Sequence, residues 1–194
     1  MNTKRSKVST ETLTLGAVLT ALVIILQFMG SFIKFGMFSI SLVLIPIVIG
    51  ASAGGWKLGA WLGFAFGMVV LLNGDAAAFL VINAIGTIIT VLLKGTLCGL
   101  SAGITYKCLE SKNKTLAVMC AAIVCPIVNT GIFFIGCLVF FLEPISEWAA
   151  AFGYGENVMK YMFLGLAGGN FLFELLTNIV LSPIVVRLLK IKKS

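Results

Sequence analysis

Six long apolar stretches, separated by short polar segments, make up most of the chain. Within each stretch the apolar residues are continuous and do not alternate with polar ones, as they would in the strands of a membrane barrel, so the pattern predicts helices. A helix needs about 20 mostly apolar residues to cross the hydrocarbon core of a bilayer. The expected helices cover residues 12–28, 39–53, 56–72, 82–106, 115–141 and 158–189. We therefore expect an all-α membrane protein in which residues 1–194 form one integral membrane domain with six transmembrane helices.

Proline, glycine and polar residues mark the expected irregularities. Pro46 lies inside the second stretch, where a proline should kink the helix. The sequence Asn73-Gly74-Asp75 should form a turn before the fourth helix. Residues 142–157 carry three glutamates, and we expect a short amphipathic segment there, at the membrane interface.

The composition supports this assignment and excludes a second, soluble domain. Of the 194 residues, 60% are of hydrophobic types and 11% are charged, whereas a soluble domain is nearer half apolar and a quarter charged. A chain of this length buries only roughly 70% of its unfolded surface. A soluble fold would therefore leave extensive apolar surface in water.

The distribution of charge predicts the orientation in the membrane. Six crossings place both termini on one side, and the basic residues expected on that side are Lys4, Arg5, Lys7, Lys57, Lys107, Lys112, Lys114, Arg187, Lys190, Lys192 and Lys193. Only Lys34 and Lys160 are expected on the opposite side, together with Asp75 and the three glutamates of segment 142–157. Basic residues concentrate in cytoplasmic loops, so we expect both termini in the cytoplasm. The net charge of +7 is then an orientation signal and does not call for a nucleic-acid partner.

The residue types argue against catalysis and metal binding. The chain contains no histidine, which is the commonest general base. The cysteines, at positions 98, 108, 120, 125 and 137, lack a metal-binding spacing and fit better as small hydrophobes. There is no phosphate-binding loop of the G-x-x-x-x-G-K-S/T type. We expect no enzyme, no metal site and no cofactor in this chain, and any ATP-driven step must use another subunit.

Small residues recur at the four-residue spacing that lets helix backbones approach closely. Ala17 and Ala21 form such a pair in the first helix. Longer repeats occur at Gly59, Gly63 and Gly67 and at Gly95, Gly99 and Gly103. We expect the glycine repeats to serve packing inside the protein, whereas the alanine pair is more open to a partner protein.

Polar residues inside the expected helices are candidates for a binding site, because each is costly in lipid unless it faces a partner or a cavity. Lys94, Asn129 and Asn170 are expected at a common depth on the order of 13 to 18 Å below the outer surface, with Glu174 one turn deeper. Lys94 and Glu174 could form a buried ion pair that holds two helices together. Alternatively, Lys94 could bind an anionic ligand group while Asn129 and Asn170 supply hydrogen bonds.

Two further residues lie near the expected outer loop. Asp75 and Asn83 could form a lid over the pocket, although Asp75 could also be an ordinary turn residue. With the four residues inside the helices, they complete the candidate substrate-binding set.

The chain resembles the substrate-binding subunits, or S components, of energy-coupling factor (ECF) transporters, which are bacterial vitamin importers. The resemblance rests on six apolar stretches in a chain of this length, the Ala17/Ala21 pair, and three local stretches, at residues 38–46, 90–96 and 126–131. It covers nearly the whole chain. The local stretches look most like the pantothenate-type subgroup.

This resemblance implies a division of labour within a larger complex in the bacterial plasma membrane. The first three helices would dock on a transmembrane coupling subunit through Ala17 and Ala21, and two cytoplasmic ATPases would use ATP. The last three helices would hold the vitamin, and the subunit would topple in the membrane to deliver it. The alternative from the residues alone is a self-sufficient six-helix permease or channel for a small polar metabolite.

Overall fold

The computed structural model describes residues 10–31, 34–35, 38–39 and 42–191, and most of them are helical. The elements are α1 (Thr10–Ser31), β1 (Lys34–Phe35), β2 (Phe38–Ser39), α2 (Leu44–Gly54), α3 (Trp56–Leu72), α4 (Ala77–Ile82), α5 (Ala84–Leu109), α6 (Lys114–Phe140), α7 (Leu142–Ala151), α8 (Val158–Tyr161), the π-helix η1 (Met162–Leu166) and α9 (Gly168–Ile191). The two strands form a short antiparallel hairpin.

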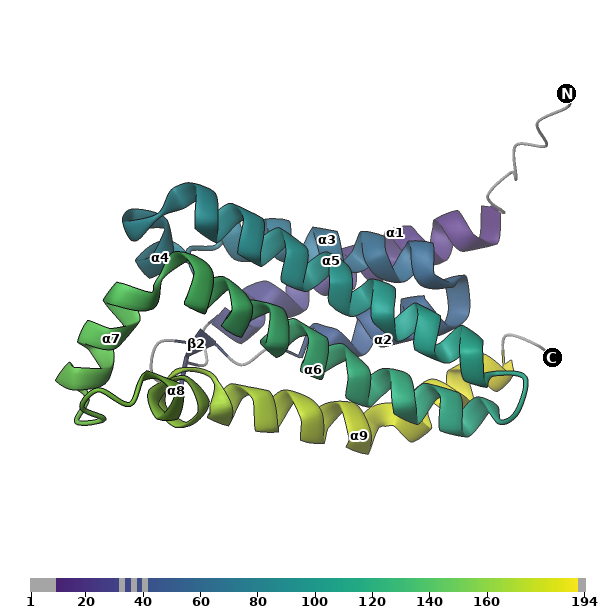
Figure 1. Ribbon diagram of the computed structural model, residues 1–194. Coiled ribbons are helices and arrows are strands. Elements are labelled where there is room, and N and C mark those ends of the chain that lie inside the picture. The colour runs from purple at the N-terminus through teal and green to yellow at the C-terminus, as the bar shows by residue number, and fades with distance from the viewer. Residues whose placement is uncertain (1–9, 32–33, 36–37, 40–41, 192–194) are drawn as a thin grey trace, which may run out of the picture.

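Six helices form a bundle and have their axes roughly aligned (Figure 1). They are α1, α2, α3, α5, α6 and α9. The start of α1 and the end of α9 lie at the same end of the bundle, which we call the terminal end. The hairpin, α4, α7 and α8 gather at the opposite end, which we call the distal end (Figure 1). The turns from α2 to α3 and from α5 to α6 lie at the terminal end, so the described basic residues Lys57, Lys107, Lys112 and Lys114 lie there too.

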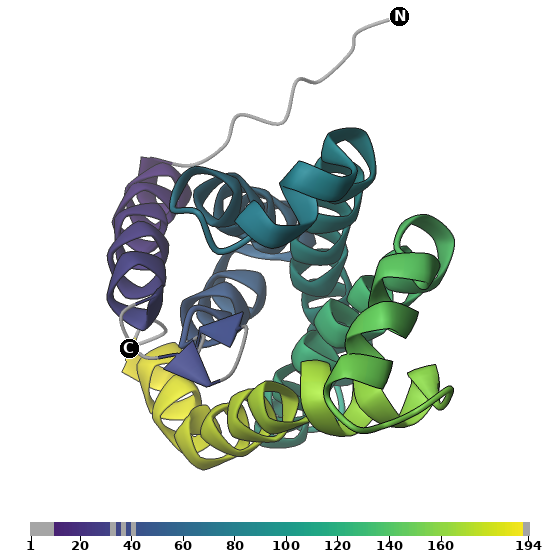
Figure 2. The same ribbon diagram turned by 90° about the vertical axis from the view of Figure 1, so that its left-hand side faces the viewer.

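Helix α2 lies at the centre of the bundle and packs against α1, α3, α5, α6 and α9 (Figure 2). Its 11 residues extend over only about 16 Å at 1.5 Å per residue. Leu44, Ile47 and Ala51 are fully buried in the main hydrophobic cluster. Helix α2 therefore fills the interior near the terminal end and does not reach through the length of the bundle.

The glycine repeats bring α3 and α5 into backbone contact. A methyl group added at Gly63 would overlap the carbonyl oxygen of Gly95, and one added at Gly59 would overlap the carbonyl oxygen of Gly99. The reciprocal additions at Gly95 and Gly99 would overlap the carbonyl oxygens of Gly63 and Gly59. The expectation that these repeats serve internal packing is confirmed, because only residues without a side chain allow this approach.

The expectation of an all-helical membrane protein is confirmed in its main part. Four described helices, α1, α5, α6 and α9, are long and apolar enough to cross a membrane, whereas α2 and α3 are shorter apolar helices. The number of six crossings therefore stays a prediction.

The helix expected at residues 39–53 begins later, at Leu44, and Ser39 belongs instead to strand β2. Pro46 consequently lies in the first turn of α2. The backbone N–H groups of a first turn have no partner within the helix, so a proline there removes no hydrogen bond. The predicted kink at Pro46 was wrong for this reason.

The prediction of one continuous helix over residues 158–189 was also wrong. It is divided into α8, η1 and α9. Ala167 leaves the helical conformation, with φ −131° and ψ −10°, and two glycines follow it at the start of α9.

The expected turn and the amphipathic segment are both present at the distal end. Gly74, with φ +86°, turns the chain between α3 and α4. Helix α7 buries Ile145 and Ala149 and exposes Glu143 and Glu147 on its other face. Its amphipathic character is confirmed, and its location at a membrane interface stays a prediction.

Candidate functional site

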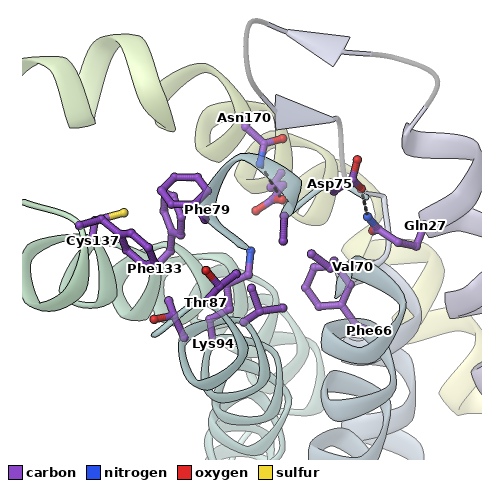
Figure 3. Close-up of a pocket in the computed structure, with 15 residues that line it drawn as sticks. Gln27, Phe66, Val70, Asp75, Phe79, Thr87, Lys94, Phe133, Cys137 and Asn170 are labelled. Carbon is purple, nitrogen blue, oxygen red and sulfur yellow. Dashed lines mark hydrogen bonds between the residues drawn. The ribbon is translucent and has the colours of Figure 1, made fainter. Parts of the chain in front are cut away.

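A cavity lies between α1, α3, α5, α6 and α9 in the distal half of the bundle (Figure 3). Its polar lining residues are Gln27, Asp75, Thr87, Thr90, Lys94, Asn170 and Glu174. Its aromatic lining residues are Phe66, Phe79, Phe133 and Phe141. No residue of α2 is among the described residues that line it. The cavity thus occupies the part of the bundle interior that α2 leaves unfilled.

Lys94 extends from α5 into this cavity (Figure 3). It lies ten residues into the helix, or about 15 Å along its axis. The Nζ atom is 5.6 Å from the ring centre of Phe66 and 5.4 Å from that of Phe133, so two aromatic rings partly stabilise the cation. Among the described residues, no Asp or Glu carboxylate lies within 4.0 Å of Nζ. The direct ion pair with Glu174 is therefore not formed in this state, and the ammonium group is open to an anion in the cavity.

Glu174 is held by amide groups from two helices. Asn170, one turn earlier on α9, donates through Nδ2 to Oε1 at 3.0 Å, and Asn129 of α6 donates through Nδ2 to Oε2 at 3.4 Å. Glu174 is 1% exposed and Asn129 is 4% exposed. A buried carboxylate needs such donors, so this cluster joins α6 to α9 beside the cavity.

Asp75 is the centre of a second polar cluster, which links α1 to the turn before α4. Its Oδ2 atom accepts hydrogen bonds from Gln27 Nε2 at 2.7 Å, from Ser31 Oγ at 2.8 Å and from Asn73 Nδ2 at 2.8 Å. Asn73 Oδ1 in turn accepts from the Asp75 backbone N–H at 3.1 Å. Asp75 is therefore both a turn residue and a lining residue, so the two interpretations of it are compatible.

Aromatic rings close the cavity towards the distal end. Phe79 of α4 packs edge-on against Phe133, Phe141 and Trp148, with ring centres 5.8, 5.0 and 5.5 Å away. The cavity volume is about 60 Å³, counted as the space open to the centres of water molecules, which is room for only a few waters. A larger ligand enters only if side chains such as Phe79 and Lys94 move aside.

Buried polar atoms without a partner gather around this cavity. In the described part of the chain they are Gln27 Oε1, Thr90 Oγ1, Asn129 Oδ1, Asn170 Oδ1 and, at the terminal end, Ser52 Oγ. Each such atom costs about 1–3 kcal/mol of stability unless a ligand or water supplies a donor. Beside Lys94 and Glu174 these atoms leave several acceptors that a polar ligand or ordered water could satisfy.

Most of the substrate-binding candidates chosen from the sequence lie at the cavity. Lys94, Asn170, Glu174 and Asp75 line the cavity, and Asn129 reaches it through Glu174.

Asn83, by contrast, is not a lining residue. Its side chain accepts a hydrogen bond from the Gly86 backbone N–H at 2.9 Å and so caps the start of α5.

Several lining residues were missed by the sequence analysis. Gln27 is an amide inside an apolar helix and is 2% exposed; the rule that polar groups within spans mark sites would have found it. Thr87 and Thr90 are weaker signals, because threonine often bonds to its own helix. The aromatic residues carry no signal in a chain this rich in phenylalanine.

The alanine pair of α1 lies away from the cavity. Ala17 and Ala21 are exposed, and Ala17 borders a groove between α1 and α3 together with Leu58 and Trp61. The position leaves this face of α1 open to lipid or to another protein.

Comparison with known families identifies the class of protein. Residues 11–189 match the family described as ECF transporter, substrate-specific component. The chain belongs to this family, whose members are membrane-embedded substrate-binding subunits of ECF transporters and not enzymes. No curated protein and no solved structure matches the chain.

Proposed function

We propose that the cavity around Lys94 is the substrate site and that the substrate is a small water-soluble molecule with a carboxylate or phosphate group. The observation that carries the proposal is the environment of Lys94. Glu174 and Asp75 each accept hydrogen bonds from neighbouring side chains, whereas no described hydrogen bond or ion pair satisfies the ammonium group. An anionic ligand group would supply the missing charge-assisted contact.

Within this class we propose pantothenate as the substrate. Its carboxylate suits Lys94, and its two hydroxyl groups and amide N–H are donors that could reach the buried unpaired acceptors, among them Asn170 Oδ1. Its branched hydrocarbon centre suits the aromatic walls. The local resemblance to the pantothenate-type subgroup supports the same choice.

We further propose that the terminal end faces the cytoplasm and that the distal end, with the cavity, faces outward. The described basic residues at the terminal end support this orientation. In this arrangement Ala17 and Ala21 contact a coupling subunit, two ATPases supply the energy, and the whole subunit topples to deliver the substrate.

Binding to the purified chain tests the substrate. We expect isothermal titration calorimetry in detergent to show saturable binding of pantothenate, and native mass spectrometry to detect any molecule that co-purifies. If pyridoxine, riboflavin or folate binds and pantothenate does not, the choice of pantothenate is wrong and the vitamin class is retained.

Reconstitution separates the S component from a self-sufficient permease or channel. Liposomes that contain this chain alone should bind but not accumulate pantothenate, whereas liposomes with the coupling subunit and ATPases should accumulate it when ATP is present. Uptake by the chain alone would establish the alternative.

A further inference from the structure

Gln27 is the polar residue that α1 contributes to the cavity (Figure 3). It lies in the helix that the family resemblance assigns to docking, and its side chain is 2% exposed. The two ends of its amide group have different surroundings. Nε2 donates to Asp75 Oδ2 at 2.7 Å, while Oε1 is buried without a hydrogen-bond partner.

The orientation of this amide is determined by the chemistry of its neighbour. An ionised carboxylate only accepts hydrogen bonds, so the amide must present its nitrogen to Asp75. The alternative orientation would place two acceptors 2.7 Å apart. Oε1 is therefore directed away from Asp75, in a side chain that lines the cavity.

Asp75 is itself fixed, so it can act as an anchor for Gln27. Ser31 Oγ and Asn73 Nδ2 each lie 2.8 Å from the same Oδ2 atom, and Asn73 Nδ2 also donates to Ser31 Oγ at 2.7 Å. This network holds the carboxylate from both α1 and the turn before α4. A buried acceptor that is held in place and left unpaired is suited to recognise a donor on a ligand, because a ligand without that donor leaves it unsatisfied.

We propose that Gln27 is a specificity-determining residue of the substrate site. Its Oε1 atom accepts a hydrogen bond from a hydroxyl or N–H group of the bound substrate, and Asp75 holds the amide in the orientation that makes this possible. The proposal rests on the proposed function of the cavity. It adds that the first helix takes part in substrate recognition and that the site selects for a donor group as well as an anion.

The experiment compares two variants that both weaken the Asp75 network. Gln27→Met removes Oε1 and one hydrogen bond to Asp75, whereas Ser31→Ala removes one hydrogen bond to Asp75 and leaves Oε1 in place. We expect Gln27→Met to bind pantothenate roughly tenfold more weakly than the unchanged chain, and Ser31→Ala to bind it within about threefold. Equal affinities of Gln27→Met and the unchanged chain, or equal losses in the two variants, would overturn the proposal.

Substrate analogues test the contact itself. Pantothenate is compared with three analogues, each of which lacks one donor. Two are the monodeoxy analogues, and the third carries a methyl group on the nitrogen of the internal amide and keeps the carboxylate. In the unchanged chain at least one analogue should bind about tenfold more weakly than pantothenate, and in Gln27→Met that difference should vanish. If every analogue shows the same difference in the unchanged chain and in Gln27→Met, Gln27 does not contact the substrate.

The outcomes also separate this inference from the choice of substrate. If the unchanged chain binds pyridoxine, riboflavin or folate in place of pantothenate, the comparison of Gln27→Met with Ser31→Ala is made with that vitamin, since each offers hydroxyl or N–H donors. If it binds none of the four, both proposals are wrong. Gln27→Leu replaces Gln27→Met should the latter not fold. Failure of both to fold would make the amide a structural element, contrary to the proposal.

Discussion

Replacement of Lys94 by methionine distinguishes a substrate-binding lysine from a structural one. Methionine has nearly the same length and volume, so the substitution removes the charge and leaves little empty space. In the described structure Nζ lies between two phenylalanine rings and has no carboxylate within 4.0 Å. The two roles therefore predict different results for affinity and for stability.

The loss of affinity follows from the contact that Lys94 offers to an anion. A hydrogen bond to a charged group contributes about 1.5–3 kcal/mol, which corresponds to a roughly tenfold to 150-fold increase in the dissociation constant. The stability of the ligand-free protein should change little. Removal of the cation costs about 0.5–2 kcal/mol for each ring contact, but it also removes a charge from an apolar environment. We expect a net change of about 1 kcal/mol or less in the free energy of unfolding.

A structural ion pair would give the opposite pattern. Removal of one partner of a buried ion pair costs about 3–5 kcal/mol, which for a chain of this size lowers the melting temperature by roughly 6–20 °C. The assays are titration calorimetry with pantothenate and thermal unfolding of the ligand-free protein in the same detergent. Lys57→Met is the matched control, because Lys57 is exposed at the terminal end. An unchanged dissociation constant in folded Lys94→Met, or a large fall in its melting temperature, would refute the assignment.

Three other substitutions test the packing, the docking face and the helix cap. Gly63→Ala should destabilise the protein by about 1–3 kcal/mol because the added methyl group forces α3 and α5 apart. Gly131→Ala is the control and should not destabilise it, because no atom lies within 4 Å of the added carbon. Thermal unfolding compares the two variants. Ala17→Trp or Ala21→Trp should leave pantothenate binding intact and abolish co-purification with the coupling subunit, so recovery of the intact complex would contradict the docking assignment. Asn83→Ala should lower the unfolding free energy by about 1 kcal/mol through loss of the cap and leave the dissociation constant unchanged; a loss of affinity above tenfold would return Asn83 to the substrate site.

The elements that could be predicted from the sequence are those set by local composition. The third helix has the predicted bounds, residues 56–72, because Gly54-Gly55 and Asn73-Gly74 end the apolar stretch on both sides. The role of the two glycine repeats in internal packing followed from their four-residue spacing, whereas their contact with each other is a finding of the structure. The hairpin before α2 and the break at Ala167 were missed, although Lys34 and the pair Gly168-Gly169 interrupt the apolar stretches there. A single lysine or a pair of glycines in an apolar stretch is also compatible with a continuous helix, so these signals did not decide the backbone conformation.

At the site, too, residue type could be interpreted from the sequence, whereas the contacts between side chains could not. Lys94, Asn170 and Glu174 were found because a polar group inside an apolar helix is rare and has few explanations. The absence of direct contact between Lys94 and Glu174 depends on a few ångströms of helix position, which no sequence pattern records. Asn83 does not line the cavity because its side chain accepts from the backbone N–H of Gly86, an alternative open to every asparagine near a helix start.

The short central helix has a consequence for how the membrane stays sealed. The cavity ends where α2 begins, and beyond that point the interior is occupied by fully buried side chains such as Leu44 and Ile47. A solute that moved from the cavity towards the terminal end would meet these apolar side chains, although Asn178 and Ser182 of α9 continue past Glu174 as buried polar groups. The arrangement thus places the polar cavity and the packed apolar part of the bundle interior one after the other along the bundle axis. While α2 stays in place it obstructs passage of a substrate through the bundle, and the proposed toppling would release substrate to the other side without moving α2 out of the interior.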